Sequence, residues 1–119
     1  MYTLTLTKEQ ATVVEQACEL LARCSMGQLD HILFGVYTAA GAPEHTEARA
    51  GLDYAARKLF GNGTGIANCD AQGKRSWDLY QVVRYRLSHD TREDDGTVGF
   101  REFINTAGEA PATIAQEEP

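Results

Sequence analysis

Residues 7–36 read TKEQATVVEQACELLARCSMGQLDHILFGV, and this stretch decides most of the fold. It opens with Thr7 followed three residues later by Gln10, the spacing of a capping box that satisfies two backbone donors at a helix start. Apolar side chains then recur at intervals of three and four along the whole stretch. The pattern predicts one long helix or two nearly collinear ones. Gly27 lies in the middle and marks either a kink or the close approach of another backbone.

Two further helices and a small sheet are expected outside this stretch. Residues 46–60 and 74–89 also place apolar side chains at helical spacing. Residues 2–7 alternate threonine and leucine, and residues 97–103 have the composition of a second strand. Strands this short persist only when they pair and pack on helices. We therefore expect an α+β fold with three main helices, the first of them long, packed on a small antiparallel sheet formed by residues 2–7 and 97–103.

The composition is that of one acidic globular domain. The chain has 119 residues, of which 43% are hydrophobic and 24% charged, with a formal net charge of -6. We expect residues 1–108 to form a single globular domain and residues 109–119 to form an extended, partly mobile tail. The acidic balance argues against polymeric nucleic acid as a partner, because phosphate-backbone binding needs a basic surface. A homo-oligomer is expected, since a second subunit adds burial to so small a chain.

The sequence gives no sign of a membrane span or of a signal peptide. No apolar run approaches the ~20 residues of a membrane span, and residues 1–5 lack the pattern of a signal peptide. Cys18, Cys24 and Cys69 form an odd set that favours reduced thiols. These features predict a cytoplasmic protein with no membrane partner.

The sequence contains none of the common metal-binding or catalytic motifs. His31, His45 and His89 are far apart, and no Cys-x-x-Cys, His-Glu-x-x-His or Gly-x-Ser-x-Gly motif occurs. Residues 95–103 are similar to the second half of an EF-hand calcium loop, but Thr91 stands where such a loop needs its first carboxylate. We therefore expect no enzyme, no catalytic residue, no bound metal and no cofactor, with a degenerate calcium loop kept as a minor alternative.

The third helix concentrates residue types that recognise flat anionic ligands. Trp77, Gln81 and Arg84 share one face at helical spacing, and Tyr80 precedes Arg84 by one turn. An arginine can hold a phosphate while an aromatic ring stacks on a base, and a glutamine side chain offers both donor and acceptor. The competing interpretation is a core pair of aromatics with arginines in surface ion pairs. The candidate ligand-binding residues are Gln28, Trp77, Tyr80, Gln81, Arg84 and Arg86.

Four segments together resemble a set of small phage and prophage proteins. They are Met26-Gly27-Gln28-Leu29, Gly65-Ile66, the run WDLYQVVRYRL at residues 77–87, and Gly108-Glu109-x-Pro111-x-x-Ile114. The resemblance spans nearly the whole chain and supplies no catalytic residues. It implies a phage-encoded accessory protein in the cytoplasm of an infected bacterial host, similar in size and setting to the oligomeric sponge proteins that blunt host immunity.

Taken together, these observations predict a non-enzymatic accessory protein that binds and sequesters a small anionic, nucleotide-derived immune signal. The alternative is a protein-protein inhibitor that recognises a host effector through its acidic surface. The degenerate calcium loop gives a third and weaker hypothesis.

Overall fold

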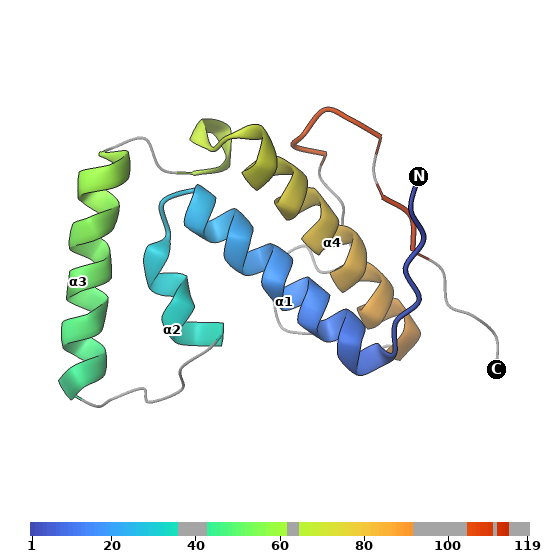
Figure 1. Ribbon diagram of the computed structural model, residues 1–119, viewed down its shortest axis with the longest axis horizontal. Helices are drawn as coiled ribbons and strands as arrows, with labels where there is room; N and C mark the ends of the chain where they lie inside the picture. Colours follow the sequence, from blue (N-terminus) through green and yellow to red (C-terminus); the bar gives the residue numbers. More distant parts are fainter. Residues whose placement is uncertain (36–42, 62–64, 92–104, 111, 115–119) are drawn as a thin grey trace.

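The computed structural model describes residues 1–35, 43–61, 65–91, 105–110 and 112–114 (Figure 1). The elements in chain order are α1 (Lys8–Ser25), the 3-10 turn η1 (Leu29–His31), α2 (Ile32–Gly35), α3 (Pro43–Phe60), the 3-10 turn η2 (Ile66–Asn68) and α4 (Ala71–Thr91). The α1, α3 and α4 helices are the counterparts of the three predicted helices. No described helix combines the length and the apolar composition needed to cross a bilayer.

The predicted α+β class is wrong, because no strand occurs among the described residues. Residues 1–7 have no regular structure, and Leu4 is exposed. The other predicted strand, residues 97–103, lies outside the described residues. Two leucines in residues 2–7 bury too little surface to order a strand by themselves. The described part of the chain is therefore all helical.

The start of α1 follows its sequence signal, and its end answers the question about Gly27. The Thr7 Oγ1 accepts from the Gln10 backbone N–H at 3.1 Å, and the Gln10 Oε1 accepts from the Thr7 N–H at 2.9 Å, which confirms the capping box. Gly27 has a φ of 87°, a left-handed conformation that favours glycine. The Gln28 N–H then donates back to the Arg23 carbonyl at 2.8 Å. With the bond from the Gly27 N–H to the Cys24 carbonyl at 3.1 Å, this bond forms a Schellman cap. The helix therefore ends at Ser25, and the expected single long first helix is wrong.

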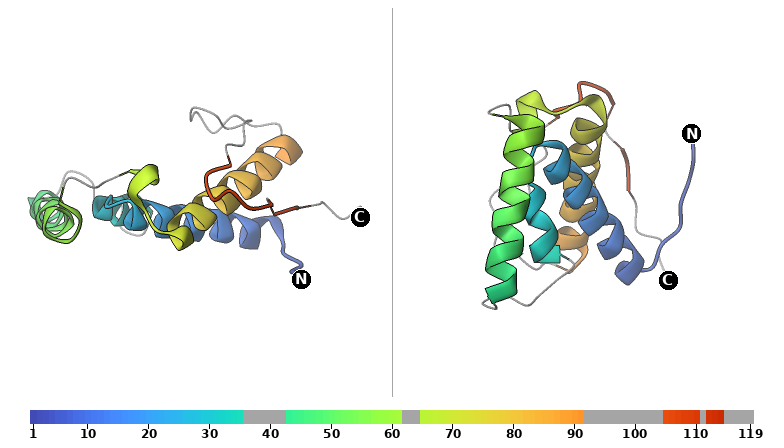
Figure 2. Two further views of the ribbon diagram at one scale, coloured as in Figure 1. Left: turned by 90° about the horizontal axis from the view of Figure 1, so that it is seen from above. Right: turned by 60° about the vertical axis from the view of Figure 1, so that its left-hand side comes forward.

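The main packing in the described chain is between α1 and α4, which run antiparallel side by side (Figures 1 and 2). A buried hydrophobic cluster of Ala22, Met26 and Cys69 lies where the end of α1 meets the start of α4. Gly73 allows this approach, because a Cβ at that position would lie 2.6 Å from the Ser25 Cβ. The glycine therefore sets how closely the two helices cross.

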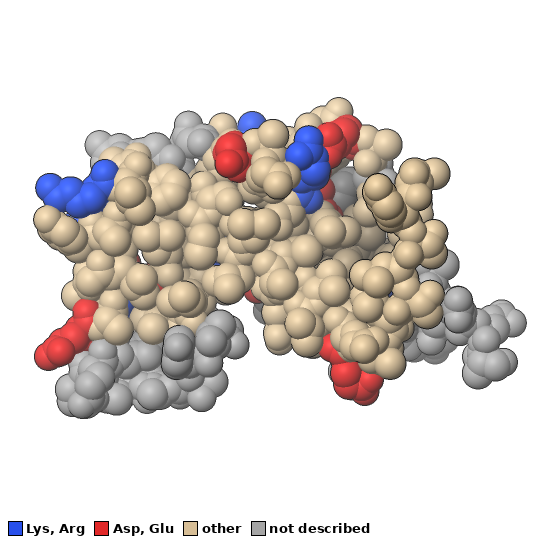
Figure 3. Space-filling view, viewed as in Figure 1, with Lys and Arg blue, Asp and Glu red and all other residues tan. Residues whose placement is uncertain are grey.

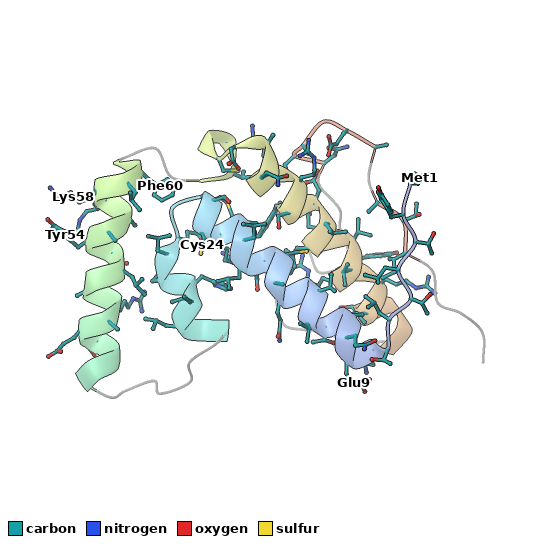
Figure 4. All side chains as sticks on the ribbon, in the orientation of Figure 1. Met1, Glu9, Cys24, Tyr54, Lys58 and Phe60 are labelled. Atoms are coloured by element: carbon teal, nitrogen blue, oxygen red, sulfur yellow. The ribbon has the colours of Figure 1, made fainter. Side chains whose placement is uncertain are left out.

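In the views of Figures 1 and 2, α3 stands at the side of the α1–α4 helix pair and contacts η1. Arg49 of α3 pairs with Asp30 of η1 at 3.3 Å. Tyr54 and Lys58 project from the far side of α3 (Figure 4), and the Lys58 ammonium lies 5.5 Å from the centre of the Tyr54 ring. Most of the described α3 side chains are thus left exposed.

The segment of residues 105–110 is attached to α4 by several bonds, most of them to the Asp78 carboxylate. Asp78 is buried, and it accepts from the backbone N–H groups of Thr106 and Ala107, each at 2.9 Å. The Thr106 hydroxyl also donates to Asp78 at 2.6 Å. Glu109 of the predicted tail pairs with Arg75. A hollow of about 200 Å³ remains between α4 and this segment.

Candidate functional site

Three of the predicted ligand-binding residues on α4 are buried within the fold. Tyr80 is 3% exposed, Gln81 is 4% exposed and Arg84 is 7% exposed. All three also have interactions within the protein. They therefore offer almost no surface to a ligand in this conformation.

Tyr80 and Arg84 form the inner part of the site. The Arg84 Nη1 donates to the Tyr80 hydroxyl at 2.7 Å, and the guanidinium carbon lies 4.8 Å from the centre of the Tyr80 ring. The Tyr80 hydroxyl also lies close enough to Glu19 of α1 to feel its charge. Burial, reinforced by the negative charge of Glu19, raises the pKa of Tyr80 to about 12 despite the opposing effect of Arg84. Tyr80 is thus a neutral link between a buried cation and an acidic side chain.

Glu19 joins this inner pair to the partly exposed edge of the α1–α4 helix pair. Its carboxylate accepts from the Arg23 Nε and lies near the Arg23 Nη2, both at 3.2 Å. The His31 Nε2 lies 3.4 Å from the other carboxylate oxygen. Arg23 and Tyr80 therefore converge with His31 on one acidic group, and the Arg23 side chain retains 30% exposure.

The turn after α1 brings Gln28 to the same place. The Arg23 Nη1 donates to the Gln28 Oε1 at 2.8 Å, while the guanidinium carbon lies 5.4 Å from the centre of the Trp77 ring. Trp77 in turn lies against Tyr80, with 5.1 Å between ring centres. Contacts therefore connect seven residues, named here the α1–α4 cluster: Glu19, Arg23, Gln28, His31, Trp77, Tyr80 and Arg84.

Arg86 stands apart from the other predicted residues. It follows Trp77 by nine positions, and at about 100° per residue that places it on the opposite side of α4. Gln81 lies on the Trp77 side of the helix, and its buried position separates it from the solvent. The structure therefore brings Gln28, Trp77, Tyr80 and Arg84 into one cluster and places Arg86 elsewhere.

Three members of the cluster escaped the sequence analysis. Glu19 and Arg23 stand four residues apart on α1, a spacing that does signal an ion pair on a helix. His31 carries no such signal, because its position depends on the turn at Gly27.

No group of three or more His, Cys, Asp or Glu side chains among the described residues could hold a metal ion. Cys18, Cys24 and Cys69 are free thiols, and burial raises the pKa of each. Their nucleophilic thiolate form is accordingly disfavoured at neutral pH.

A second surface of interest lies on the side of α1 turned away from α4. Lys8 and Glu9 are exposed in the first turn, but no exposed position of α1 beyond them is charged. Figure 3 shows uncharged side chains along α1, with acidic side chains at the end where Glu9 lies (Figure 4). The α1 outer face is defined here as Val13, Gln16, Ala17 and Leu21, all exposed.

Comparison of the chain with protein families, curated proteins and solved structures found no match. The resemblance to small phage and prophage proteins therefore stays a hypothesis.

Proposed function

We propose that this protein acts by binding another protein, without catalysis, and that the α1 outer face is the contact surface. The observation that carries the proposal is the missing charge along that face. On a chain with a net charge of -6, the exposed positions of α1 beyond Glu9 are all uncharged, and two of them are large apolar residues. The core of a protein–protein interface is typically depleted of charged residues.

The geometry of α1 favours this use. Val13 is 63% exposed and Leu21 is 50% exposed, and they lie on one helix whose opposite side is fixed against α4. Covering each of these side chains would contribute about 1 kcal/mol, roughly half the value for burying a whole Val or Leu. A rigid helix also loses little conformational freedom on binding. The contact surface is thus apolar, in contrast to the acidic surface expected from composition.

Photo-crosslinking tests the proposal at residue level. A photoreactive amino acid at Ala17 is expected to give protein adducts in the producing cell, because Ala17 lies in the middle of the α1 outer face. The same amino acid at Ala48, an exposed alanine of α3, is the matched control. Equal adduct yields from the two positions, or none from Ala17, would contradict the proposal.

A second candidate function is binding of a nucleotide-derived anion at the edge of the α1–α4 cluster. It is favoured by Arg23, which is partly exposed and lies over Trp77 with Gln28 as its neighbour. An incoming phosphate would have to replace Glu19 as the partner of Arg23. Calorimetry with cyclic dinucleotides, cyclic trinucleotides and cyclic ADP-ribose isomers tests this function. Binding that is lost in Arg23→Ala would support it, and no binding at micromolar concentration would exclude it.

A further inference from the structure

We infer that the partner of the α1 outer face is a second copy of this chain, packed antiparallel through the same face. This inference rests on the proposed function, because it assigns an occupant to the proposed contact surface. Three features of the described residues point to self-association: the symmetry of the face, its lack of charge and the small core of the chain.

The α1 outer face is self-complementary about Ala17. Val13 precedes Ala17 by four residues and Leu21 follows it by four. In an antiparallel pair related by a two-fold axis at Ala17, Val13 of each copy meets Leu21 of the other. Such an arrangement is the isologous contact expected of a homodimer. The small alanine at the axis lets the two helices approach closely.

Charge also favours this face for self-association. Two copies that each carry a net charge of -6 repel one another wherever acidic surfaces meet. The α1 outer face contains no charged side chain, and Gln16 adds a group that can both donate and accept hydrogen bonds. Contact through this face therefore avoids placing like charges directly against each other.

The described hydrophobic core is built mostly from small side chains, so added burial on α1 would stabilise the chain. Its buried hydrophobic residues are mostly small, namely Ala11, Ala22, Met26, Ala56, Cys69, Tyr80 and Val83. None of the large side chains in the described ranges is fully buried. Packing a second copy on α1 would add apolar burial to this described core.

The size of the face sets the expected strength. The stretch from Gln10 to Cys24 is about 22 Å long, and a helix with its side chains is about 10 Å wide. That area is smaller than the ~800 Å² per partner of a standard stable interface. The expected dimer is therefore weak and forms in the micromolar range or above.

Sedimentation analysis over a concentration series tests for the dimer. The wild-type chain is expected to shift from monomer to dimer as concentration rises, and Leu21→Glu is expected to weaken the association at least tenfold. Leu59→Glu is the matched control, because Leu59 is an exposed leucine on α3. A monomer at every concentration, or equal effects of the two substitutions, would overturn the inference. Circular dichroism checks that both variants stay folded.

Cysteine pairing tests the direction of the helices. When Val13→Cys and Leu21→Cys proteins are mixed and oxidised, an antiparallel dimer gives the 13–21 disulfide, whereas a parallel dimer gives 13–13 and 21–21. Mass spectrometry distinguishes these links from those of the native cysteines. Dominant 13–13 and 21–21 links would overturn the antiparallel arrangement. A monomeric chain whose Ala17 photo-crosslinks to a different protein would overturn the dimer while leaving the proposed function intact.

Discussion

The Arg84 guanidinium donates a 2.7 Å hydrogen bond to the hydroxyl of Tyr80 from one turn further along α4, and both residues are buried. This contact turns two predicted ligand-binding residues into partners of each other. Through Glu19 it also connects α4 to α1. The inner part of the α1–α4 cluster therefore stabilises the packing of α1 against α4, whatever the outer edge of the cluster binds.

Removal of the Tyr80 hydroxyl should destabilise the protein. Tyr80→Phe deletes a hydrogen bond to a charged, buried group, so the free energy of unfolding should fall by about 1–3 kcal/mol. Tyr54→Phe, at an exposed position of α3 where the ring keeps its contact with Lys58, should have little effect. Urea unfolding followed by circular dichroism measures both. Equal stabilities of the two variants would count against a structural role for the Tyr80–Arg84 pair.

The raised pKa of Tyr80 predicts a loss of stability at alkaline pH. The Tyr80 pKa is about 12 in the folded protein, against the ordinary tyrosine value of 10.0. Between these two pH values the unfolded chain loses the proton first, so it binds fewer protons than the folded chain. The free energy of unfolding therefore falls as pH rises from about 10 to about 12. The measurement is stability against pH, and the fall in this window should be shallower in Tyr80→Phe.

Gly73 should tolerate no larger residue without loss of stability. In Gly73→Ala the new Cβ would lie 2.6 Å from the Ser25 Cβ, so α4 would have to move away from α1. We expect destabilisation by about 1–3 kcal/mol. Gly51→Ala is the control, because nothing lies within 4 Å of a Cβ there and the position is helical. That variant should gain up to about 1 kcal/mol, and thermal unfolding compares the two.

Asp78 should control the attachment of residues 105–110. In Asp78→Ala the N–H groups of Thr106 and Ala107 lose their acceptor, so the segment should detach from α4 more readily. The expected result is faster hydrogen exchange at these two amides and earlier proteolysis in the segment. Asp53→Ala changes an exposed acidic residue of α3 and serves as the control. Unchanged exchange at Thr106 in Asp78→Ala would refute this account of the attachment.

Local signals in the sequence predicted the start of α1 but not the path of the chain after it. The capping box needs contacts between Thr7 and Gln10 alone, so spacing was enough to find it. At Gly27 the same sequence is compatible with a kinked helix and with a helix end, and the backbone bonds of the turn decide between them. The predicted strand at residues 2–7 is wrong, because alternation of two leucines with threonines is too weak a signal to specify a strand by itself.

The candidate site was predicted in part for a similar reason. Helical spacing placed Trp77 and Arg84 on one face, which the structure bears out through their shared cluster. Spacing alone could not show whether this face of α4 is open to a ligand, because a face next to the core can be either exposed or covered by α1. Arg23 and His31 joined the cluster through packing between distant segments, which one sequence does not reveal.

The solvent accessibility of Leu21, compared with that of Leu59, tests directly whether the α1 outer face is covered by a partner in the cell. Both leucines are exposed in the isolated chain, on α1 and α3 respectively. Carbene footprinting with mass spectrometry is applied to the dilute purified protein and to the protein in the producing cell. The account predicts that Leu21 labelling falls several-fold in the cell while Leu59 labelling stays the same. Equal labelling of Leu21 in the two states would contradict the assignment of the α1 outer face as the binding surface.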